Sequence, residues 1–223
     1  MAVINIAIDG PAGAGKSSLS RRAAKALGYL YVDTGALYRA VGLSMLRHGI
    51  DPSDAQAVAD ALGGVKVSLR FADGEQRVFL SDEDVSDAIR TPEASMAAST
   101  VSAHPVVRDF LFALQRGIAA ENNCLMDGRD IGTVVLPDAK VKIFLTASPE
   151  TRADRRCKEL REKGMPTPYD EVLADIIQRD YNDSHRAVAP LRQADDAVLL
   201  DTSALGFDAA LDALLQIIKE ESV

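Results

Sequence analysis

The chain has 223 residues and a formal net charge of −8 at pH 7, and apolar residues make up 47% of it. This length can bury the core of one domain, or of a core with a small inserted lobe, without disulfides. The acidic charge argues against a general nucleic-acid binder, and no run approaches the roughly 18 apolar residues of a membrane helix. Cys124 and Cys157 lack a CxxC spacing, which favours free thiols in a reducing cytoplasm.

Short apolar runs of strand length alternate along the chain with longer segments of helical spacing. The runs are Val3–Ile8, Tyr29–Val32, Cys124–Met126, Val141–Leu145 and Ala197–Leu200. Such alternation is typical of an α/β fold, and we expect a parallel five-stranded sheet flanked by helices.

Several helix boundaries are also marked. Thr91-Pro92 and Ser148-Pro149 each place a capping side chain before a proline, which predicts a helix start. Gly28, Gly49 and Gly164 follow helical segments and predict helix ends.

The segment Gly10–Ser17, GPAGAGKS, matches the pattern G-x-x-x-x-G-K-[ST] between a predicted strand and a helix beginning near Lys16. Its glycines let backbone N–H groups turn toward phosphate oxygens, and the helix start adds partial positive charge. Lys16 can reach the β- and γ-phosphates, and the Ser17 hydroxyl can bind Mg²⁺. The sequence therefore predicts a P-loop that holds Mg-ATP. The predicted ATP contacts are Gly10, Pro11, Ala12, Gly13, Ala14, Gly15, Lys16, Ser17 and Ser18.

One stretch interrupts the alternation of strands and helices. Apolar and polar residues alternate from 65 to 71, Asp73-Gly74 follows, and β-type residues resume at Val78–Leu80. This pattern predicts an antiparallel hairpin where an α/β fold needs only a crossover. We interpret residues 62–90 as a small lobe inserted into a core formed by residues 1–61 and 91–223.

Polar residues follow two further predicted strands. One group is Asp33-Thr34-Gly35, which continues to Tyr38 and Arg39, and the other is Asp127–Asp130. Either string alone is more often a turn than a site. In an open α/β sheet, however, ligands bind beyond the carboxyl ends of the strands, so both groups beside a P-loop favour a functional site.

Two helical segments carry arginines at spacings that share a face. The first holds Arg152, Arg155 and Arg156, within a segment of about residues 152–168 that could form a lid. The second holds Arg179, Asp183 and Arg186. Arginine suits the oxygens of a transferring phosphoryl group, but such faces are also common on solvated surfaces. Spacing does not decide between the two interpretations.

The chain contains no N-K-x-D string of the kind that reads guanine, which argues against a GTPase. Its strings instead resemble those of bacterial cytidylate kinases, nucleoside monophosphate kinases that phosphorylate CMP and dCMP with ATP. The matching strings are IAIDGPAGAGKSS, DTGALYR, DGRDIGTVV, PDAKVKIFLTAS and HRAVAPL, and they span the chain from its first strand to about residue 201. In this family the insert is an enlarged NMP-binding lobe.

The resemblance implies a role for each matching residue. Those that would contact CMP are Asp33, Thr34, Arg39, Ser99, Arg108, Arg129, Asp130, Arg179, Asp183 and Arg186. Within this set, Arg39 and Arg129 would hold the phosphate, and Arg179 and Asp183 the ribose. Ser99, Arg108 and Asp130 would read the base, with Arg186 supporting Asp130. Asp33 and Thr34 would line the acceptor site. The catalytic set would be Lys16, Arg129, Arg155 and Arg156, with Ser17 binding Mg²⁺.

Base chemistry agrees with this assignment. Cytosine presents an amine donor that a carboxylate such as Asp130 can accept, and ring acceptors to which Arg108 can donate. Uracil reverses the first two groups, and a buried polar mismatch costs about 1–3 kcal/mol or more. We therefore expect CMP and dCMP to be preferred over UMP.

Two alternatives stay open on the sequence. One is a P-loop kinase for another small acceptor, and the other is a non-catalytic nucleotide-binding switch. The remaining expectations are small-molecule substrates, no nucleic-acid or membrane partner, a monomer and a cytoplasmic location.

Overall fold

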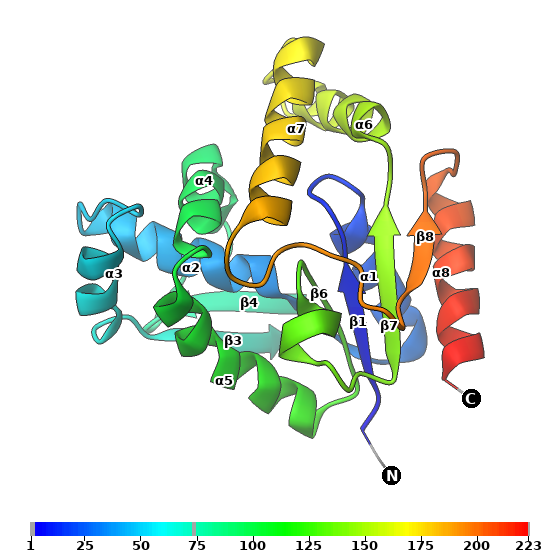
Figure 1. The fold of residues 1–223 in the computed structure, drawn as a ribbon, viewed down its shortest axis with the longest axis horizontal. Coiled ribbons are helices and arrows are strands. Elements are labelled where there is room, and N and C mark those ends of the chain that lie inside the picture. The colour runs from blue at the N-terminus through cyan, green and yellow to red at the C-terminus, as the bar shows by residue number, and fades with distance from the viewer. Residues whose placement is uncertain (1–2, 73–74, 223) are drawn as a thin grey trace.

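The computed structural model describes residues 3–72 and 75–222 (Figure 1). One parallel sheet forms the centre, with strand order β2-β6-β1-β7-β8. Its strands are β1 (Asn5–Asp9), β2 (Leu30–Asp33), β6 (Cys124–Gly128), β7 (Val141–Thr146) and β8 (Val198–Asp201). Each predicted run is confirmed to within two residues at either end. The predicted five-stranded α/β fold is therefore confirmed.

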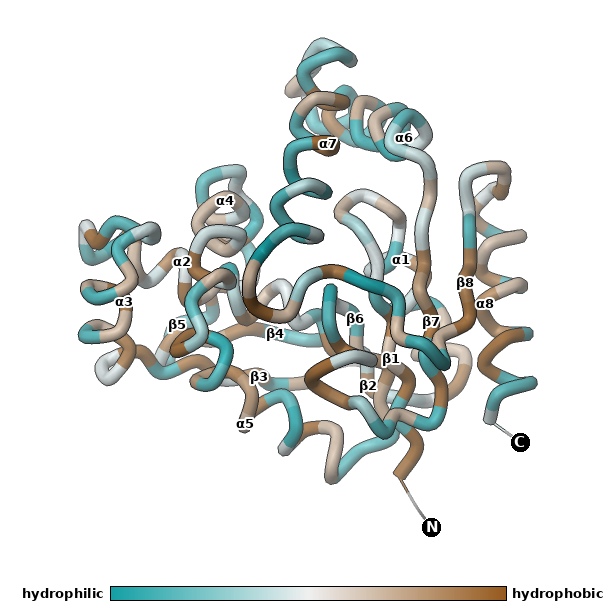
Figure 2. The backbone as a smooth tube through the Cα atoms, in the orientation of Figure 1, coloured by the Kyte–Doolittle hydropathy of each residue, from teal (hydrophilic) through white to brown (hydrophobic). Residues whose placement is uncertain are grey.

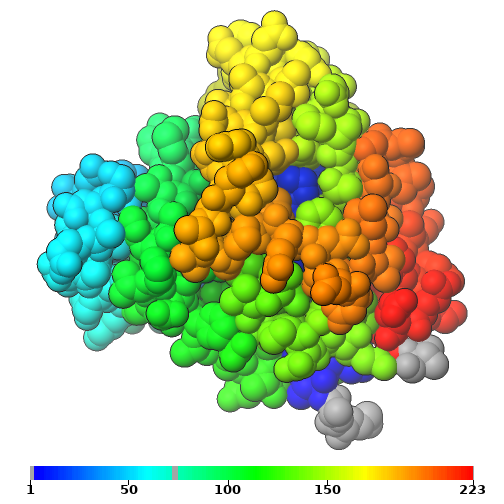
Figure 3. Space-filling view, viewed as in Figure 1, coloured from blue at the N-terminus to red at the C-terminus, as the bar shows by residue number. Residues whose placement is uncertain are grey.

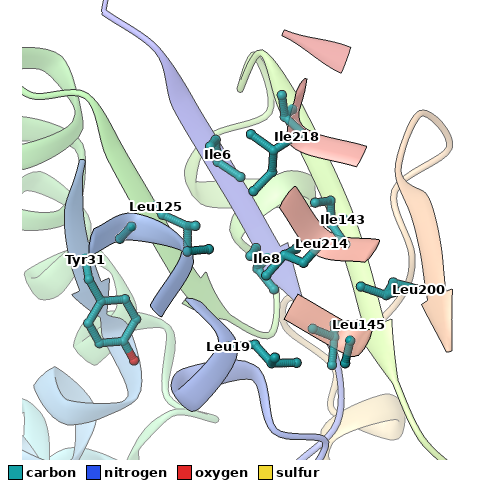
Figure 4. Close-up of a cluster of buried hydrophobic side chains, with 14 of the residues drawn as sticks. Ile6, Ile8, Leu19, Tyr31, Leu125, Ile143, Leu145, Leu200, Leu214 and Ile218 are labelled. Atoms are coloured by element: carbon teal, nitrogen blue, oxygen red, sulfur yellow. The ribbon is translucent and has the colours of Figure 1, made fainter. Parts of the chain in front are cut away.

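Successive residues of the central strands face opposite layers of helices. Ile6 and Ile8 of β1 pack against α1 (Lys16–Leu27) and α8 (Phe207–Glu221), as the close-up in Figure 4 shows for this cluster. Ala7, between them, packs toward α5 (Pro105–Glu121) and a one-turn π-helix, η2 (Ile131–Val135). Because side chains alternate along a strand, a strand buried on both faces is apolar throughout. This explains the continuous apolar runs in the sequence.

The predicted helix boundaries are also confirmed. Helices α4 (Pro92–Val101) and α6 (Pro149–Glu162) begin at the predicted prolines. The Thr91 hydroxyl accepts the N–H of Ala94 at 3.1 Å, and Ser148 accepts that of Thr151 at 3.2 Å. Glycines with positive φ follow the ends of α1, α2 (Thr34–Arg47) and α6, at the predicted positions 28, 49 and 164.

The predicted hairpin exists as two strands of a three-stranded antiparallel sheet. Its strands are β3 (Val67–Ala72), β4 (Glu75–Leu80) and β5 (Glu83–Asp84). The third strand was not expected, because two acidic residues give no β signal and only its pairing with β4 makes it a strand. The predicted Asp73-Gly74 turn lies outside the described residues. Val78 of this sheet packs against Ala36 and Ala40 of α2, which attaches the insert to the core.

Two helices lie beyond the carboxyl ends of the central strands. In Figure 1, β7 runs up toward α6, and α7 (Tyr169–His185) packs beside α6 through a small apolar cluster that includes Ala153 and Ile176. The part of α7 nearest the sheet is hydrophilic, whereas β8 is apolar (Figure 2). On the other side, α3 (Ala55–Leu62) packs against α2 and α5. None of the described helices is long and apolar enough to cross a membrane.

Gly42 permits a close contact that a larger residue would disturb. A Cβ built there would lie 2.9 Å from both the Ala97 Cβ and the Ala98 nitrogen of α4. Alanine normally stabilises a helix interior by roughly 0.5–1 kcal/mol relative to glycine. For Gly42→Ala we expect the opposite sign, a loss of about 1–3 kcal/mol in the free energy of unfolding measured with urea.

Gly63→Ala is the matched control, because a Cβ at Gly63 meets nothing within 4 Å and the residue has a φ of −59°. We expect it to be neutral or stabilising by up to about 1 kcal/mol. Equal stability of Gly42→Ala and the unmodified chain would contradict the proposed packing constraint.

Candidate active site

The P-loop joins the end of β1 to the start of α1, below α6 and α7 (Figure 1). Figure 3 shows a hollow between α6 and α7 in which N-terminal residues, coloured blue, are visible. Gly10 has a φ of 147°, and a Cβ there would lie 1.9 Å from the carbonyl oxygen of Leu145 on β7. Only glycine fits this position, so the close approach of β7 sets the path of the loop.

Lys16 is almost fully buried at the start of α1. Its ammonium group donates to the carbonyl oxygens of Gly10 at 2.8 Å and Pro11 at 2.7 Å. Burial lowers the pKa of Lys16, and the positive charge of Arg129 lowers it further. The cation is thus placed on the loop itself, where the charge of a phosphate group would favour its protonated form.

Asp127, at the end of β6, faces the P-loop hydroxyl. Ser17 Oγ donates to Asp127 Oδ2 at 2.8 Å, and burial raises the pKa of Asp127, as does the nearby Asp33. A hydroxyl and a carboxylate are the hard oxygen ligands that Mg²⁺ takes, usually with one or two carboxylates plus substrate phosphates. The sequence pattern predicted Ser17 as a metal ligand, and it placed Asp127 among the polar strand-end residues without a role at the metal. The available signal was an acidic residue at the end of an apolar run.

No group of three or more His, Cys, Asp or Glu residues that could hold a metal ion occurs in residues 3–72 and 75–222. Mg²⁺ is usually bound by one or two carboxylates together with substrate phosphates, and the oxygens of Ser17 and Asp127 are donors of that kind. The chain's own donor set therefore fits Mg²⁺ that arrives with a nucleotide.

The end of β2 carries the first part of the second group. Asp33 caps α2 by accepting the N–H of Ala36 at 3.0 Å, and its other oxygen pairs with Arg39 at 2.8 Å. The Thr34 hydroxyl donates to the carbonyl oxygen of Asp127 at 2.8 Å, which joins the ends of β2 and β6. The predicted residues of these two strand ends are thus brought together.

Several predicted arginines share one region. Arg129 Nε donates to Asp183 Oδ2 at 2.8 Å, linking the end of β6 to α7. Burial lowers the pKa of Arg179 on α7, and the positive charges of Arg129, Arg156 and Arg39 lower it further, with Asp183 opposing them. Arginines from α2, α6 and the end of β6 therefore lie near enough to Arg179 of α7 for their charges to act on it. Such a concentration of positive charge in an acidic protein indicates an anion site.

A second buried cluster surrounds Asp130. Arg108 of α5 pairs with Asp130, and both side chains are more than nine-tenths buried. Arg186 Nη2 lies 3.4 Å from the other carboxylate oxygen. The Arg108 guanidinium also lies 5.7 Å from the centre of the Tyr38 ring. Ser99 is half-buried on the neighbouring α4. The cluster thus places a carboxylate acceptor, Asp130, beside two guanidinium donors, Arg108 and Arg186.

The predicted arginine face of α6 divides into three different environments. Arg156 pairs with Glu159 at 2.8 Å on the exposed side. Arg155 donates to the carbonyl oxygens of Thr202 at 2.7 Å and Ala14 at 3.3 Å. The third, Arg152, is buried.

Arg152 joins the P-loop to α7. It donates to the carbonyl oxygen of Ala12 at 3.0 Å and binds both carboxylate oxygens of Asp180 at 2.9 and 2.5 Å. Its guanidinium is buried and occupied by these partners, so in this structure it links segments of the fold. Arg152 shares the spacing pattern of Arg155 and Arg156, and only the packing of α6 on α7 distinguishes it from them.

Asp9, the residue before the P-loop, was also missed. Its carboxylate accepts the N–H groups of Ile131 and Gly132, each at 2.7 Å. These residues begin the π-helix η2 (Ile131–Val135), which directly follows Asp130. Asp9 thus ties the P-loop strand to the segment that carries Asp130. Burial raises its pKa to about 6, although the two backbone N–H groups lower it.

Asp9 should make stability depend on pH. Its pKa of about 6 in the folded chain lies above the ordinary aspartate value of 3.8, so its contribution to stability is full below the unfolded pKa and is lost as pH rises through 6. We expect the unfolding free energy of the unmodified chain, minus that of Asp9→Asn, to fall by about 2–3 kcal/mol between pH 4 and pH 7. Urea denaturation at each pH measures this.

Asp138→Asn, a matched change at an exposed residue, controls for the substitution itself and should show a much smaller dependence. A difference for Asp9→Asn that grows with pH would contradict the raised pKa.

Known proteins are similar to this chain over nearly its full length. A family model described as cytidylate kinase matches residues 6–220. A cytidylate kinase of Streptococcus sanguinis is 52% identical over 207 residues, covering 92% of each chain. One of Caldicellulosiruptor bescii is 48% identical over 217 residues, which is 97% of this chain and 96% of that protein. One of Rhodococcus opacus is 50% identical over 218 residues, covering 97% and 95%.

Among solved structures, an uncharacterized protein from Eubacterium ventriosum superposes with a TM-score of 0.52 at 12% identity, covering 97% of this chain and 98% of that one. At that identity, the likeness shows a shared fold alone.

Proposed function

The chain belongs to the cytidylate kinase family and phosphorylates CMP and dCMP with ATP, and we propose that it does so by binding the two phosphates at the two anion sites described above. The observation that carries this proposal is the presence of two sets of cationic side chains at the carboxyl ends of neighbouring strands. Lys16 lies on the P-loop after β1, and Arg39 and Arg129 follow β2 and β6. Transfer between two phosphates needs such a pair of facing sites.

The donor half is the P-loop. Its backbone N–H groups and Lys16 would hold the triphosphate, with contacts from Gly10 to Ser18. Ser17 and Asp127, whose oxygens lie 2.8 Å apart, would hold Mg²⁺, which supplies charge neutralisation on the β- and γ-phosphates.

The acceptor phosphate would bind Arg39 and Arg129. Each is already oriented by a carboxylate, Asp33 and Asp183 respectively. Arg179 and Asp183 on α7 would bind the ribose, with Asp33 and Thr34 lining the site. A guanidinium held in place before the substrate binds loses less freedom on binding.

The base would be read by the buried cluster around Asp130. Asp130 would accept from the cytosine amine, while Arg108 and Ser99 would meet the ring acceptors and Arg186 would support Asp130. The ion pair of Arg108 with Asp130 supports this arrangement, because it holds a donor beside an acceptor, as the cytosine edge requires.

Catalysis would consist of positioning and charge neutralisation. The acceptor is a phosphate anion, so no general base is needed, and Lys16, Arg129, Arg155 and Arg156 would stabilise the charge that develops during transfer. Arg155 and Arg156 lie on α6, within the proposed lid of residues 152–168. Closure of this lid and of the insert at 62–90 would exclude the water that otherwise hydrolyses ATP.

The proposal includes a monomer that acts on small molecules in the cytoplasm. A cytoplasmic location would give the enzyme access to ATP and nucleoside monophosphates.

Acceptor specificity tests the function directly. With ATP as donor, ADP release measured by a coupled assay should be rapid with CMP and dCMP and slower with UMP, dTMP and AMP. We expect kcat/KM for UMP to be at least about tenfold lower than for CMP, since one buried polar mismatch costs about 1–3 kcal/mol. Equal values for UMP would refute the base-reading role. If turnover were fast only with a different acceptor, the chain would be a kinase for that acceptor. If ATP were hydrolysed at a rate independent of any acceptor, the chain would be a nucleotide switch.

The role of Asp127 can be tested through the metal dependence. Asp127→Asn keeps the size of the side chain and removes its charge, so we expect the Mg²⁺ concentration for half-maximal rate to rise by about tenfold or more. Titration of free Mg²⁺ at saturating ATP and CMP measures it, with Asp138→Asn as the matched control. An unchanged Mg²⁺ dependence would remove Asp127 from the metal site.

A further inference from the structure

A glutamine of the insert forms a clamp on the end of β2. Gln76 of β4 accepts the backbone N–H of Asp33 at 2.8 Å and donates to the carbonyl oxygen of the same residue at 3.2 Å. Because β2 is an edge strand of the central sheet, its outer backbone groups have no strand partner within that sheet. The side-chain amide of Gln76 takes the place of the missing strand at Asp33.

Asp33 in turn holds the arginine that would bind the acceptor phosphate. Its carboxylate caps α2 through Ala36 and pairs with Arg39 at 2.8 Å. Arg39 Nε is buried and has no hydrogen-bond partner among the described residues. Since a buried unpaired donor is costly, this N–H is suited to an incoming oxyanion. The chain of contacts therefore runs from the insert, through Asp33, to an unused donor of Arg39.

The three side chains also share one cavity. Asp33, Arg39 and Gln76 line a pocket at the junction of α1, α2 and the insert, together with Arg21 and Arg77. The clamp thus spans the boundary between the core and the insert. A shift of β4 relative to β2 would change the position of Asp33 directly.

We propose that Gln76 is a positioning residue for the acceptor phosphate, acting through Asp33 on Arg39. This inference rests on the proposed binding of the CMP phosphate by Arg39. Gln76 contacts none of the base-reading residues, so it sets affinity for the phosphate end of the acceptor and leaves recognition of cytosine unchanged. It also gives the insert a second function: besides covering the acceptor, the lobe fixes the geometry of an arginine that belongs to the core.

The first test compares substrates. For Gln76→Ala we expect KM for CMP to rise about tenfold through the loss of two hydrogen bonds. KM for ATP should stay within about twofold, as should inhibition by cytidine, which carries the base and sugar without the phosphate. A general loosening of the site would weaken cytidine as much as CMP, and that result would overturn the proposal.

Two further variants separate hydrogen bonding from packing. Gln76→Glu keeps the shape and the acceptor for the Asp33 N–H, but places an oxygen against the Asp33 carbonyl, so at pH 8 we expect a loss for CMP at least as large. Wild-type behaviour of Gln76→Glu would contradict the clamp. Gln56→Ala is the matched control, because the Gln56 side chain donates to Asp60 of the same helix, α3, at 2.9 Å, far from the clamp in sequence. Gln56→Ala should leave KM for CMP, KM for ATP and inhibition by cytidine unchanged. Thermal unfolding confirms that each variant is folded, and Gln76→Glu carries the test should Gln76→Ala not fold.

A double-mutant cycle identifies the route of the effect. If Gln76 acts through Arg39, adding Gln76→Ala to Arg39→Ala should raise KM for CMP by less than about twofold more. Full additivity would overturn the proposed route. An Arg39→Ala variant with unchanged KM for CMP would instead refute the phosphate role of Arg39. If Arg39→Ala raises KM for CMP and Gln76→Ala does not, the positioning role of Gln76 is refuted while the phosphate role of Arg39 stands.

Discussion

The structure depends on concentrating positive charge at one edge of a sheet in a protein whose net charge is −8. Three of the arginines there pair with carboxylates. Arg39 pairs with Asp33, Arg129 with Asp183, and Arg108 with Asp130. These carboxylates limit the repulsion among the cations and fix their directions, which is the condition for electrostatic preorganisation. The acidic residues near the site therefore serve the binding of anions.

The fold meets this requirement by placing strand ends next to one another. Because β6 lies between β1 and β2, the P-loop, Asp33 and Asp127 reach the same edge. Three polar side chains, of which Asp9 and Arg152 are buried and Gln76 is half-buried, then link the segments around it. Asp9 joins β1 to η2, Arg152 joins the P-loop to α7, and Gln76 joins the insert to β2. Hydrogen bonds inside the fold thus join the P-loop and its strand to the segments that carry the other site residues.

The P-loop and the helices above it are held in different ways. Most of the P-loop is buried against the sheet, although Gly13 and Ser17 are exposed, whereas α6 and α7 pack on each other through a small cluster. Arg156 lies on the exposed side of α6 in an ion pair with Glu159, and exposed pairs of this kind contribute little stability. Breaking this pair would therefore cost little, whereas Arg152 attaches α6 firmly to the P-loop and to α7.

The sequence by itself determined the strands, the helix starts at Pro92 and Pro149, the hairpin and the P-loop, because these depend on periodicity and on residues within a few positions of one another. It also identified the polar groups at the strand ends. Only the tertiary structure decided which of them meet. Ser17 and Asp127 are separated by 110 residues along the chain, and Asp9 and Ile131 by 122. The tertiary structure also distinguished buried Arg152 from exposed Arg156, although the spacing of the two residues in the sequence places them on the same helix face. Such contacts follow from strand order and helix packing, and no local pattern encodes either.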